Sequence, residues 1–187
     1  MSYIFVKNIL DIIFSFCLLI FTAPILIVCI ILIKLESKGP MFFTQERVGK
    51  DGVIFKIFKL RTMKNNCQQK KGQVFLNNSQ ITRVGFYLRR FKIDELPQIL
   101  NVLLGQMSII GPRPCLPSLL ENFDKNAKFR LKVKPGLTGW SQVNGNIYNS
   151  WPKRWELDKY YVENVSFLLD LRIFVLTTGV IILGEKK

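Results

Sequence analysis

The chain has 187 residues, which is enough for one compact domain with an attached membrane segment and too short for two independent catalytic domains. Its 27 Lys and Arg residues against 13 acidic residues give a net charge of +14, which predicts an anionic partner such as a phosphorylated lipid, a nucleotide or a nucleic acid. The chain contains no histidine, which excludes imidazole bases, Ser/His/Asp triads and His-rich zinc sites and makes carboxylates the leading candidates for acid–base or nucleophilic chemistry.

An almost continuous apolar run over residues 12–33 is long enough to cross the hydrocarbon layer of a membrane as a helix. Pro24 lies at its centre, where the missing N–H and a steric clash predict a kink. Lys7 precedes the run and Lys34 and Lys38 follow it, and positive residues favour the cytoplasmic side of a membrane. From these residues alone, a re-entrant helix and a kinked single span are equally favoured.

The segment after the apolar run changes to a strand pattern. Residues 41–44 and 53–58 are rich in β-branched and aromatic side chains and flank Asp51-Gly52, which predicts a short β-hairpin. Residues 65–79 are polar and predict an exposed loop or a short surface helix. The four cysteines of the chain form no CxxC pair, which favours a reducing, cytosol-facing location.

Helical periodicity dominates the rest of the chain. Apolar residues spaced three and four apart over residues 84–104 predict two helices or one bent helix, and a mixed helical pattern resumes over residues 151–164. The apolar tail, residues 167–183, carries Asp170 and Arg172 near its start. Because these charges are costly inside a bilayer, a helix in the membrane interface or packed on the domain is expected rather than a second span.

The stretch DELPQ, residues 94–98, carries the clearest chemical signal. Asp94 is a favoured N-cap residue and Pro97 is tolerated in a first turn, so Asp94 and Glu95 are predicted at a helix N-terminus, where the dipole favours carboxylates and phosphate. With Arg89 and other cations nearby, the pair has the parts for covalent phosphoryl transfer, and a divalent cation would help two phosphates approach. A purely structural cap is the favoured alternative on the pentapeptide alone.

Basic residues recur near turn signals. Arg113 lies between Pro112 and Pro114, which restrict the backbone and can aim a guanidinium at phosphate oxygens. Lys59 and Arg61 alternate with apolar residues on a predicted strand. The alternatives are an arginine in a rigid surface turn and a solvated strand face.

The order of these segments resembles the bacterial sugar transferase family, the monotopic polyprenyl-phosphate phosphoglycosyl transferases, over nearly the whole chain. Each marker is weak alone, whereas the ordered set is specific. The markers are the apolar segment with its central proline, TQERVG at 44–49, FKLRTM at 58–63, DELPQ at 94–98 followed by NVL at 101–103 and Gly105, GPRP at 111–114, PGLTGWSQVNG at 135–145 and ELDKYY at 156–161.

The resemblance implies a ping-pong reaction. Asp94 would attack the β-phosphate of a UDP-sugar, release UMP and hold the phosphosugar covalently until undecaprenyl phosphate takes it. By the same resemblance Glu95 would assist as a base toward the lipid phosphate, and Asp94 would also contact Mg2+. The other residues expected to contact substrate are Lys59, Arg89 and Arg113 at the phosphates, and Arg61, Gln142 and Asp158 at the nucleotide sugar.

The resemblance also implies an α+β architecture. A re-entrant membrane helix, residues 1–38, would join a small, mostly helical cytosolic domain, residues 39–187, with a short β-hairpin and interfacial amphipathic helices. The enzyme would lie in the bacterial inner membrane with its catalytic domain on the cytoplasmic face, and downstream glycosyltransferases of a glycan pathway are further expected partners. No nucleic-acid partner is expected, since no RNA-binding or helix-turn-helix signature is present.

Two features qualify this interpretation. The family often carries a serine before the helix-breaking proline, whereas this chain has Ala23-Pro24, so re-entry is less strongly indicated. The chain ends soon after the apolar tail, as in short members similar to the diacetylbacillosamine-phosphate transferase, which favours an N-acetylated amino sugar over a plain hexose. The exact sugar, the glycan pathway and the oligomeric state are left open.

Two other functions compete with the transferase. One is a membrane-bound phosphohydrolase that forms the same kind of aspartyl-phosphate intermediate and transfers the phosphoryl group to water. The other is a non-catalytic, membrane-tethered module whose basic surface binds acidic lipid or nucleic acid.

Overall fold

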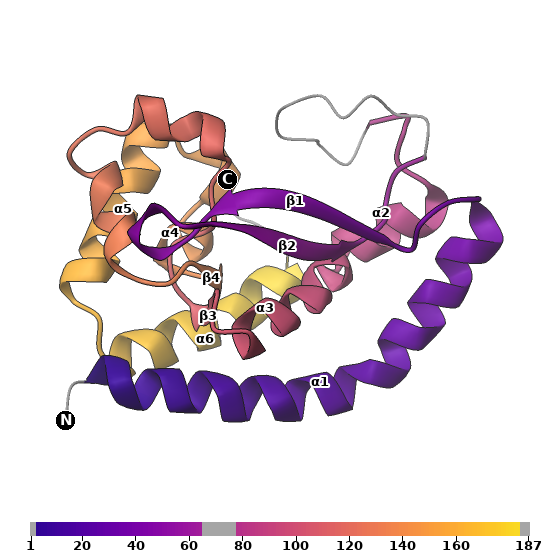
Figure 1. The fold of residues 1–187 in the computed structure, drawn as a ribbon, viewed down its shortest axis with the longest axis horizontal. Helices are drawn as coiled ribbons and strands as arrows, with labels where there is room; N and C mark the ends of the chain where they lie inside the picture. Colours follow the sequence, from indigo (N-terminus) through magenta and orange to yellow (C-terminus); the bar gives the residue numbers. More distant parts are fainter. Residues whose placement is uncertain (1–2, 65–77, 184–187) are drawn as a thin grey trace.

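The computed structural model describes residues 3–64 and 78–183, so most of the predicted polar loop at 65–79 lies outside the described residues. The fold is α+β, as predicted: a long N-terminal helix, α1 (Tyr3–Glu36), runs beneath a body that carries two small sheets and the remaining helices (Figure 1). In chain order the other elements are β1 (Phe42–Val48), η1 (Lys50–Gly52), β2 (Ile54–Leu60), α2 (Arg83–Arg90), η2 (Ile93–Gln98), α3 (Ile99–Leu103), β3 (Ser108–Ile110), η3 (Pro117–Asn122), η4 (Ala127–Lys132), β4 (Gly136–Thr138), α4 (Trp140–Val143), η5 (Asn146–Tyr148), α5 (Trp151–Glu163) and α6 (Phe167–Leu183).

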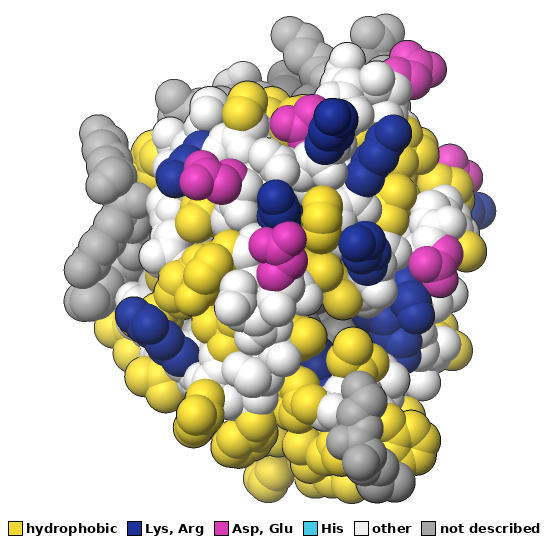
Figure 2. Space-filling model, turned by 90° about the vertical axis from the view of Figure 1, so that its left-hand side faces the viewer, with side chains coloured by type: hydrophobic (Ala, Val, Ile, Leu, Met, Phe, Trp, Pro, Cys, Tyr) yellow, Lys and Arg dark blue, Asp and Glu magenta, His cyan; other side chains and the backbone are white. Residues whose placement is uncertain are grey.

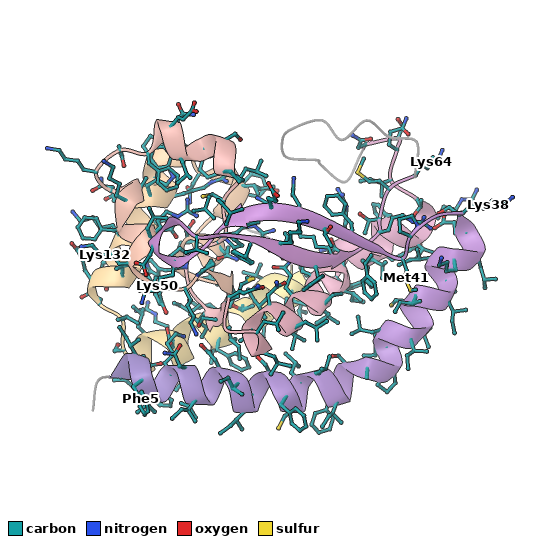
Figure 3. All side chains as sticks on the ribbon, viewed as in Figure 1. Phe5, Lys38, Met41, Lys50, Lys64 and Lys132 are labelled. Atoms are coloured by element: carbon teal, nitrogen blue, oxygen red, sulfur yellow. The ribbon has the colours of Figure 1, made fainter. Side chains whose placement is uncertain are left out.

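Helix α1 is, among the described residues, the one helix that is long and apolar enough to cross a membrane. It contains Pro24 and is bent, as expected of a helix with an internal proline (Figure 1). Much of its apolar surface is exposed: Phe5 points away from the body in Figure 3, and Phe21 and Leu35 are each 78% exposed. In Figure 2 hydrophobic side chains cover the lower part of the molecule, and most charged side chains lie above them.

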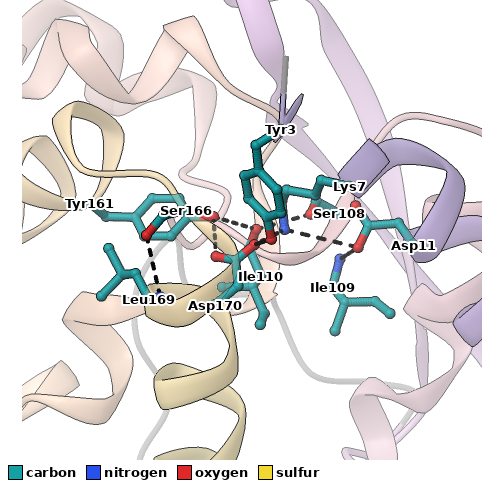
Figure 4. Close-up of polar contacts among 10 residues, drawn as sticks. All are labelled: Tyr3, Lys7, Asp11, Ser108, Ile109, Ile110, Tyr161, Ser166, Leu169 and Asp170. Atoms are coloured by element: carbon teal, nitrogen blue, oxygen red, sulfur yellow. Dashed lines mark hydrogen bonds and ion pairs between the residues drawn. The ribbon is translucent and has the colours of Figure 1, made fainter. Parts of the chain in front are cut away.

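The N-terminal end of α1 is bonded to the body through a buried polar cluster (Figure 4). Tyr3 Oη and Lys7 Nζ each donate to Asp170 Oδ2 on α6, both at 2.7 Å, and Asp11 Oδ1 accepts from the backbone N–H of Ile109 on β3 at 3.3 Å. Asp170 is only 5% exposed, so its charge is stabilised inside the protein. Helix α6 therefore packs on the body, which is one of the two placements expected for the charged tail.

The C-terminal end of α1 is bonded to the body as well. The Arg61 guanidinium donates to three backbone carbonyls at the end of α1, the shortest bond being 2.6 Å to Ser37 O. In the other direction, the Glu36 carboxylate accepts from the backbone N–H groups of Arg83 at 2.6 Å and Val84 at 3.0 Å, which caps α2. Glu36 thus satisfies backbone N–H groups that the start of α2 leaves unpaired, and Arg61 fixes the turn that follows α1.

The predicted hairpin is present, with strands of seven residues each. β1 and β2 pair antiparallel from Phe42↔Leu60 to Val48↔Ile54. Because side chains alternate along a strand, every second residue faces the body, and Ile57 is buried there against α3 and the segment that follows it. The covered face of the hairpin therefore looks onto the segment that carries the carboxylate pair.

The second sheet is a short parallel pair, β3 with β4, in the register Ser108↔Gly136. The chain after β3 crosses β4 so closely that a Cβ added at Gly136 would lie 2.1 Å from the backbone N of Gly111. Only glycine permits this approach. The crossing positions the loop that contains Arg113.

Candidate active site

Asp94 and Glu95 lie in η2, a 3-10 turn that leads directly into the short helix α3. The expectation that Asp94 caps a helix is wrong: the cap position belongs to Lys92, in the left-handed conformation at φ 57°, and the carboxylates sit inside the first turn. Residues 84–104 thus form two helices, α2 and α3, as one of the two expectations had it, and the 3-10 turn η2 lies between them. Asp94 is 7% exposed, so local contacts and not a long helix dipole determine its properties.

Asn101 of α3 holds this turn against β2. Its Oδ1 accepts from the backbone N–H of Phe58 at 3.1 Å, and its Nδ2 donates to the carbonyl of Lys56 at 2.8 Å. Asn101 is fully buried, and its amide pairs with the edge of β2 as a neighbouring strand would. Lys59, one residue beyond Phe58, is thereby presented to the carboxylate pair.

Glu95 is the centre of a three-residue charge cluster. Its Oε1 lies 2.7 Å from Lys59 Nζ and 2.6 Å from Arg113 Nη2, and its Oε2 lies 3.1 Å from Arg113 Nη1. The two contacts with Arg113 form the bidentate fork that guanidinium and carboxylate prefer. Two of the expected phosphate-binding residues are thus brought together, with Glu95 between them.

The loop carrying Arg113 is held from behind by a second ion pair. Arg130 Nη2 donates to the carbonyl of Arg113, and Arg130 Nε lies 3.0 Å from Asp158 Oδ2 on α5. Asp158 is 2% exposed, and its burial raises its pKa to about 6 although Arg130 opposes the rise. Asp158 therefore contacts Arg130 behind the active-site loop, and its predicted role at the nucleotide sugar stays a prediction.

The pKa values of the two neighbouring carboxyl groups are shifted in opposite directions. Burial, and then the charge of Glu95, raise the pKa of Asp94 to about 6, although Lys59, Arg89 and Lys92 oppose the rise. Burial acts in the same direction on Glu95, but Arg113 and Lys59 outweigh it and hold the pKa of Glu95 well below its usual range. At neutral pH both groups are ionised, and Asp94 is the more basic.

Arg89 approaches the pair from α2. Its Nε donates to Thr62 Oγ1 at 2.8 Å, and its charge acts on Asp94. Gly85, one turn earlier on the same face, allows this packing, because a Cβ at Gly85 would lie 2.2 Å from the carbonyl oxygen of Thr62. The third expected phosphate-binding residue therefore also lies at the site.

The remaining predicted contacts lie elsewhere. Arg61 points to the end of α1, as described above. Gln142 is buried on α4, where its Nε2 donates to the carbonyl of Leu137 at 2.9 Å. The predicted roles of Arg61 and Gln142 in binding the nucleotide sugar stay predictions.

Three residues that support the site were assigned no function from the sequence. Asn101 holds β2, Arg130 holds the Arg113 loop, and Thr62 accepts a hydrogen bond from Arg89. One signal was available: Asn101 interrupts an apolar helical pattern between Leu100 and Val102. A polar residue at such a position is buried with its hydrogen bonds satisfied or it destabilises the fold. Arg130 and Thr62 carry no comparable local signal.

The acidic pair suits Mg2+ that is shared with a substrate. In the described part of the chain no group of three or more His, Cys, Asp or Glu side chains lies together, so a site made of protein ligands alone is not found there. Mg2+ commonly takes one or two carboxylates and completes its shell with phosphate oxygens and water. Asp94 offers one such carboxylate, since both oxygens of Glu95 contact Lys59 or Arg113.

Comparison with known proteins identifies the family to which these residues belong. The bacterial sugar transferase family model matches residues 2–184. EpsL of Bacillus subtilis, an uncharacterized sugar transferase, is 40% identical over 179 residues, which cover 96% of this chain and 88% of EpsL. A UDP-N-acetylgalactosamine-undecaprenyl-phosphate N-acetylgalactosaminephosphotransferase of Aeromonas hydrophila is 39% identical over 97% of this chain and 45% of its own length.

A UDP-glucose:undecaprenyl-phosphate glucose-1-phosphate transferase of Klebsiella pneumoniae is 42% identical over 91% of this chain and 39% of its own length. The chain thus spans most of EpsL and less than half of these two named transferases. The family match over nearly the whole chain agrees with the ordered motifs and with the clustered carboxylates and cations. This chain belongs to the bacterial sugar transferase family.

Proposed function

We propose that the protein transfers a sugar 1-phosphate from a UDP-sugar to undecaprenyl phosphate, with release of UMP, through a covalent intermediate on Asp94. The product is a polyprenyl-diphosphate-linked sugar, the first membrane-bound intermediate of a glycan or glycoconjugate. Relatives are named for this class of reaction, with N-acetylgalactosamine or glucose as the sugar.

The observation that carries the proposal is the unequal pair of carboxylates among cations. Asp94 is buried and ionised at neutral pH, yet with a pKa of about 6 it is a stronger base, and so a better nucleophile, than an ordinary aspartate. Lys59, Arg89 and Arg113 surround the pair and can neutralise the charge of a diphosphate. A nucleophile and its electrostatic support thus occupy one water-poor site.

The reaction balances in two displacements. In the first, an Asp94 oxygen bonds to the β-phosphorus, the bond from that phosphorus to the bridging oxygen breaks, and UMP leaves with the electron pair. In the second, an oxygen of the lipid phosphate bonds to the same phosphorus, and the bond to Asp94 breaks. The carboxylate is restored and a diphosphate is formed.

Glu95 is proposed to hold the two cations until the donor binds. In the arrangement described here the pKa of Glu95 is too low for it to accept a proton readily. Phosphate oxygens that compete for Lys59 and Arg113 would loosen the ion pairs and raise the pKa of Glu95. Glu95 then becomes a competent base toward the lipid phosphate, the role that family resemblance implies.

Asp94 and the donor phosphates are the groups proposed to hold Mg2+. The bound cation would supply positive charge that neutralises the phosphates as they approach a carboxylate. Chelation of divalent cations is expected to stop turnover, measured as UMP release. Full activity in excess chelator would exclude a metal requirement.

The proposed location is the cytoplasmic face of the bacterial inner membrane, with α1 as a re-entrant helix. Both ends of α1 are hydrogen-bonded to one body, through Lys7 at one end and Glu36 at the other, and the helix between them is bent. A helix that crossed the bilayer would place its ends on opposite faces. Single cysteines at Ile4 and Lys38 should both react with an impermeant maleimide from the cytoplasmic face, and labelling of one of them from the other face alone would exclude re-entry.

The donor is proposed to be a UDP-linked N-acetylated amino sugar. The decisive assay incubates purified protein in detergent with undecaprenyl phosphate and a panel of donors that includes UDP-N-acetylgalactosamine and UDP-glucose, and measures UMP. Multiple-turnover UMP release that requires undecaprenyl phosphate would support a transferase, whereas continued donor hydrolysis without lipid would indicate a phosphohydrolase. Preference for UDP-glucose would refute the amino-sugar assignment alone.

The covalent step has its own test. Asp94→Asn preserves shape and removes the nucleophile, so turnover should fall by at least about 1,000-fold. Wild-type protein incubated with donor alone should show a phosphosugar adduct at Asp94 by mass spectrometry. A substantially active Asp94→Asn variant, or an adduct on another residue, would exclude the mechanism.

A further inference from the structure

Arg47, the penultimate residue of β1, lies beside the active site and has no role in the mechanism described above. Its side chain lines a hollow. The other residues that line it are Ile57, Lys59, Gln98, Arg113 and Pro114. Two of these are the cations that hold Glu95, so the hollow lies beside the charge cluster of the proposed active site.

The hairpin register places Arg47 and Lys59 at opposite ends of this hollow. Arg47 pairs with Phe55 and Lys59 pairs with Phe43, so both cations lie on the covered face of the hairpin. They are four residue positions apart along the strands, which corresponds to about 13 Å. The charge of Lys59 acts on Asp94, so Arg47 marks the end of the hollow that lies away from the nucleophile.

In the described part of the chain Arg47 has no hydrogen-bonded carboxylate partner, although the charge of Glu95 acts on it. Among the described residues both groups that accept its hydrogen bonds are neutral, Gln45 Oε1 at 2.6 Å and the carbonyl of Pro114 at 3.3 Å, and its buried Nε meets no acceptor. Burial and the nearby Arg113 guanidinium lower the pKa of Arg47 to about 10, so it is still a cation at neutral pH. A half-buried cation without a carboxylate partner is costly unless an anion binds beside it.

The stereochemistry of phosphoryl transfer indicates which anion that is. In an in-line displacement the leaving group departs on the side opposite the nucleophile. Lys59, whose charge acts on Asp94, lines one end of the hollow, so a group that leaves the β-phosphorus opposite Asp94 lies toward Arg47. We propose that Arg47 binds the phosphate of the departing nucleotide and so sets the direction of the donor in the site, an inference that rests on the proposed function.

The surface beyond Arg47, on the side away from Lys59, is hollowed as well. A second hollow is lined by Val48 and Gly49, which follow Arg47, and by Phe123 and Arg130, and it shares Arg113 with the first. The nucleotide would therefore extend toward the hairpin turn, and the sugar would lie on the other side of the β-phosphorus.

The test compares Arg47→Gln and Arg47→Lys with wild type. Steady-state UMP release is measured with either substrate varied, and UMP is added as a product inhibitor. Arg47→Gln should raise both the KM for the UDP-sugar and the inhibition constant of UMP by about 10- to 100-fold, the value of a lost charge-assisted hydrogen bond, and leave the KM for undecaprenyl phosphate unchanged. Arg47→Lys should recover part of the loss, because it keeps the charge without the guanidinium fork.

Lys56→Gln is the matched control, since it removes an exposed cation on the other face of the same hairpin, outside both hollows, and should behave as wild type. Unchanged UMP inhibition in Arg47→Gln would overturn the inference, and so would a rise confined to the KM for undecaprenyl phosphate, which would assign Arg47 to the lipid phosphate. If Arg47→Gln does not fold, as judged by thermal unfolding, unchanged constants in Arg47→Lys would overturn it equally.

Failure of the proposed function gives a different result, because wild-type protein would then release no UMP with any donor and lipid phosphate. Direct binding of UMP, measured by calorimetry on wild type and Arg47→Gln, tests the arginine independently of turnover. Equal affinities would overturn the inference in that case too.

Discussion

Asp94→Asn should make the protein more stable at neutral pH while it abolishes turnover. Burial and the neighbouring Glu95 raise the pKa of Asp94 from its ordinary 3.8 to about 6, so keeping the group ionised in the folded state costs about 3 kcal/mol, since a difference of one in pKa is worth about 1.4 kcal/mol. The substitution removes this cost together with the nucleophile. For a chain of this size the apparent Tm should rise by about 6–12 °C.

The gain in stability should depend on pH with a defined sign. A carboxyl group whose pKa is raised by folding binds a proton more tightly in the folded state, so wild-type stability falls as pH rises from about 4 to about 6 and is then level. Asparagine does not titrate. The difference between variant and wild type should therefore be small near pH 4 and complete by about pH 7.

The assay is thermal unfolding in detergent, followed by tryptophan fluorescence at both ends of this pH range. Asp51→Asn is the matched control, because it changes an exposed aspartate in the hairpin turn, at φ 54°, a conformation that asparagine adopts as readily. A variant at residue 94 that is less stable than wild type at neutral pH, or equally stabilised at both pH values, would refute this account of the site.

Three further predictions follow from the buried charges. Glu95→Gln should lower the free energy of unfolding by about 3–5 kcal/mol, because it leaves Lys59 buried without its carboxylate partner, and an unchanged denaturant midpoint would contradict this. Turnover should fall about tenfold for each unit of pH below about 6, because Asp94 takes up a proton. A pH–rate profile that is flat down to about pH 5 would exclude Asp94 as the titrating nucleophile. Asp170→Asn should destabilise the protein by about 3 kcal/mol and lower its apparent Tm, because it removes the 2.7 Å ion pair with Lys7. A Tm equal to that of wild type would show that this contact does not hold α1 to the body.

The predictions that succeeded rest on signals contained in a few neighbouring residues. Apolar spacing gave the C-terminal helices nearly residue for residue, with residues 151–164 found as Trp151–Glu163 and residues 167–183 found as Phe167–Leu183. The Asp51-Gly52 turn gave the hairpin, and the apolar run with Pro24 gave a long, bent first helix. The spacing of apolar residues, the residue types of a turn and the missing N–H of a proline each act within one or two turns of the chain. These local structures can therefore be predicted from sequence alone.

The N-cap prediction failed because it assumed that η2 was the start of an ordinary helix. Lys92 adopts a left-handed conformation and a 3-10 turn follows, so the carboxylates lie inside the turn. Tertiary contacts override local propensity here, because the amide of Asn101 holds the following helix against β2. No pattern within residues 94–98 encodes that contact.

By itself, then, the sequence determined which side chains could carry the chemistry: two adjacent carboxylates, three cations near turns, and no histidine. Only the tertiary structure decided how they act on one another. Glu95 meets Lys59 across 36 residues and Arg113 across 18, and these ion pairs hold its pKa low while its neighbour Asp94 titrates near 6. The physical reason is that a pKa depends on burial and on the charges that packing brings within a few ångströms, and the spacing of residues along the chain does not specify either.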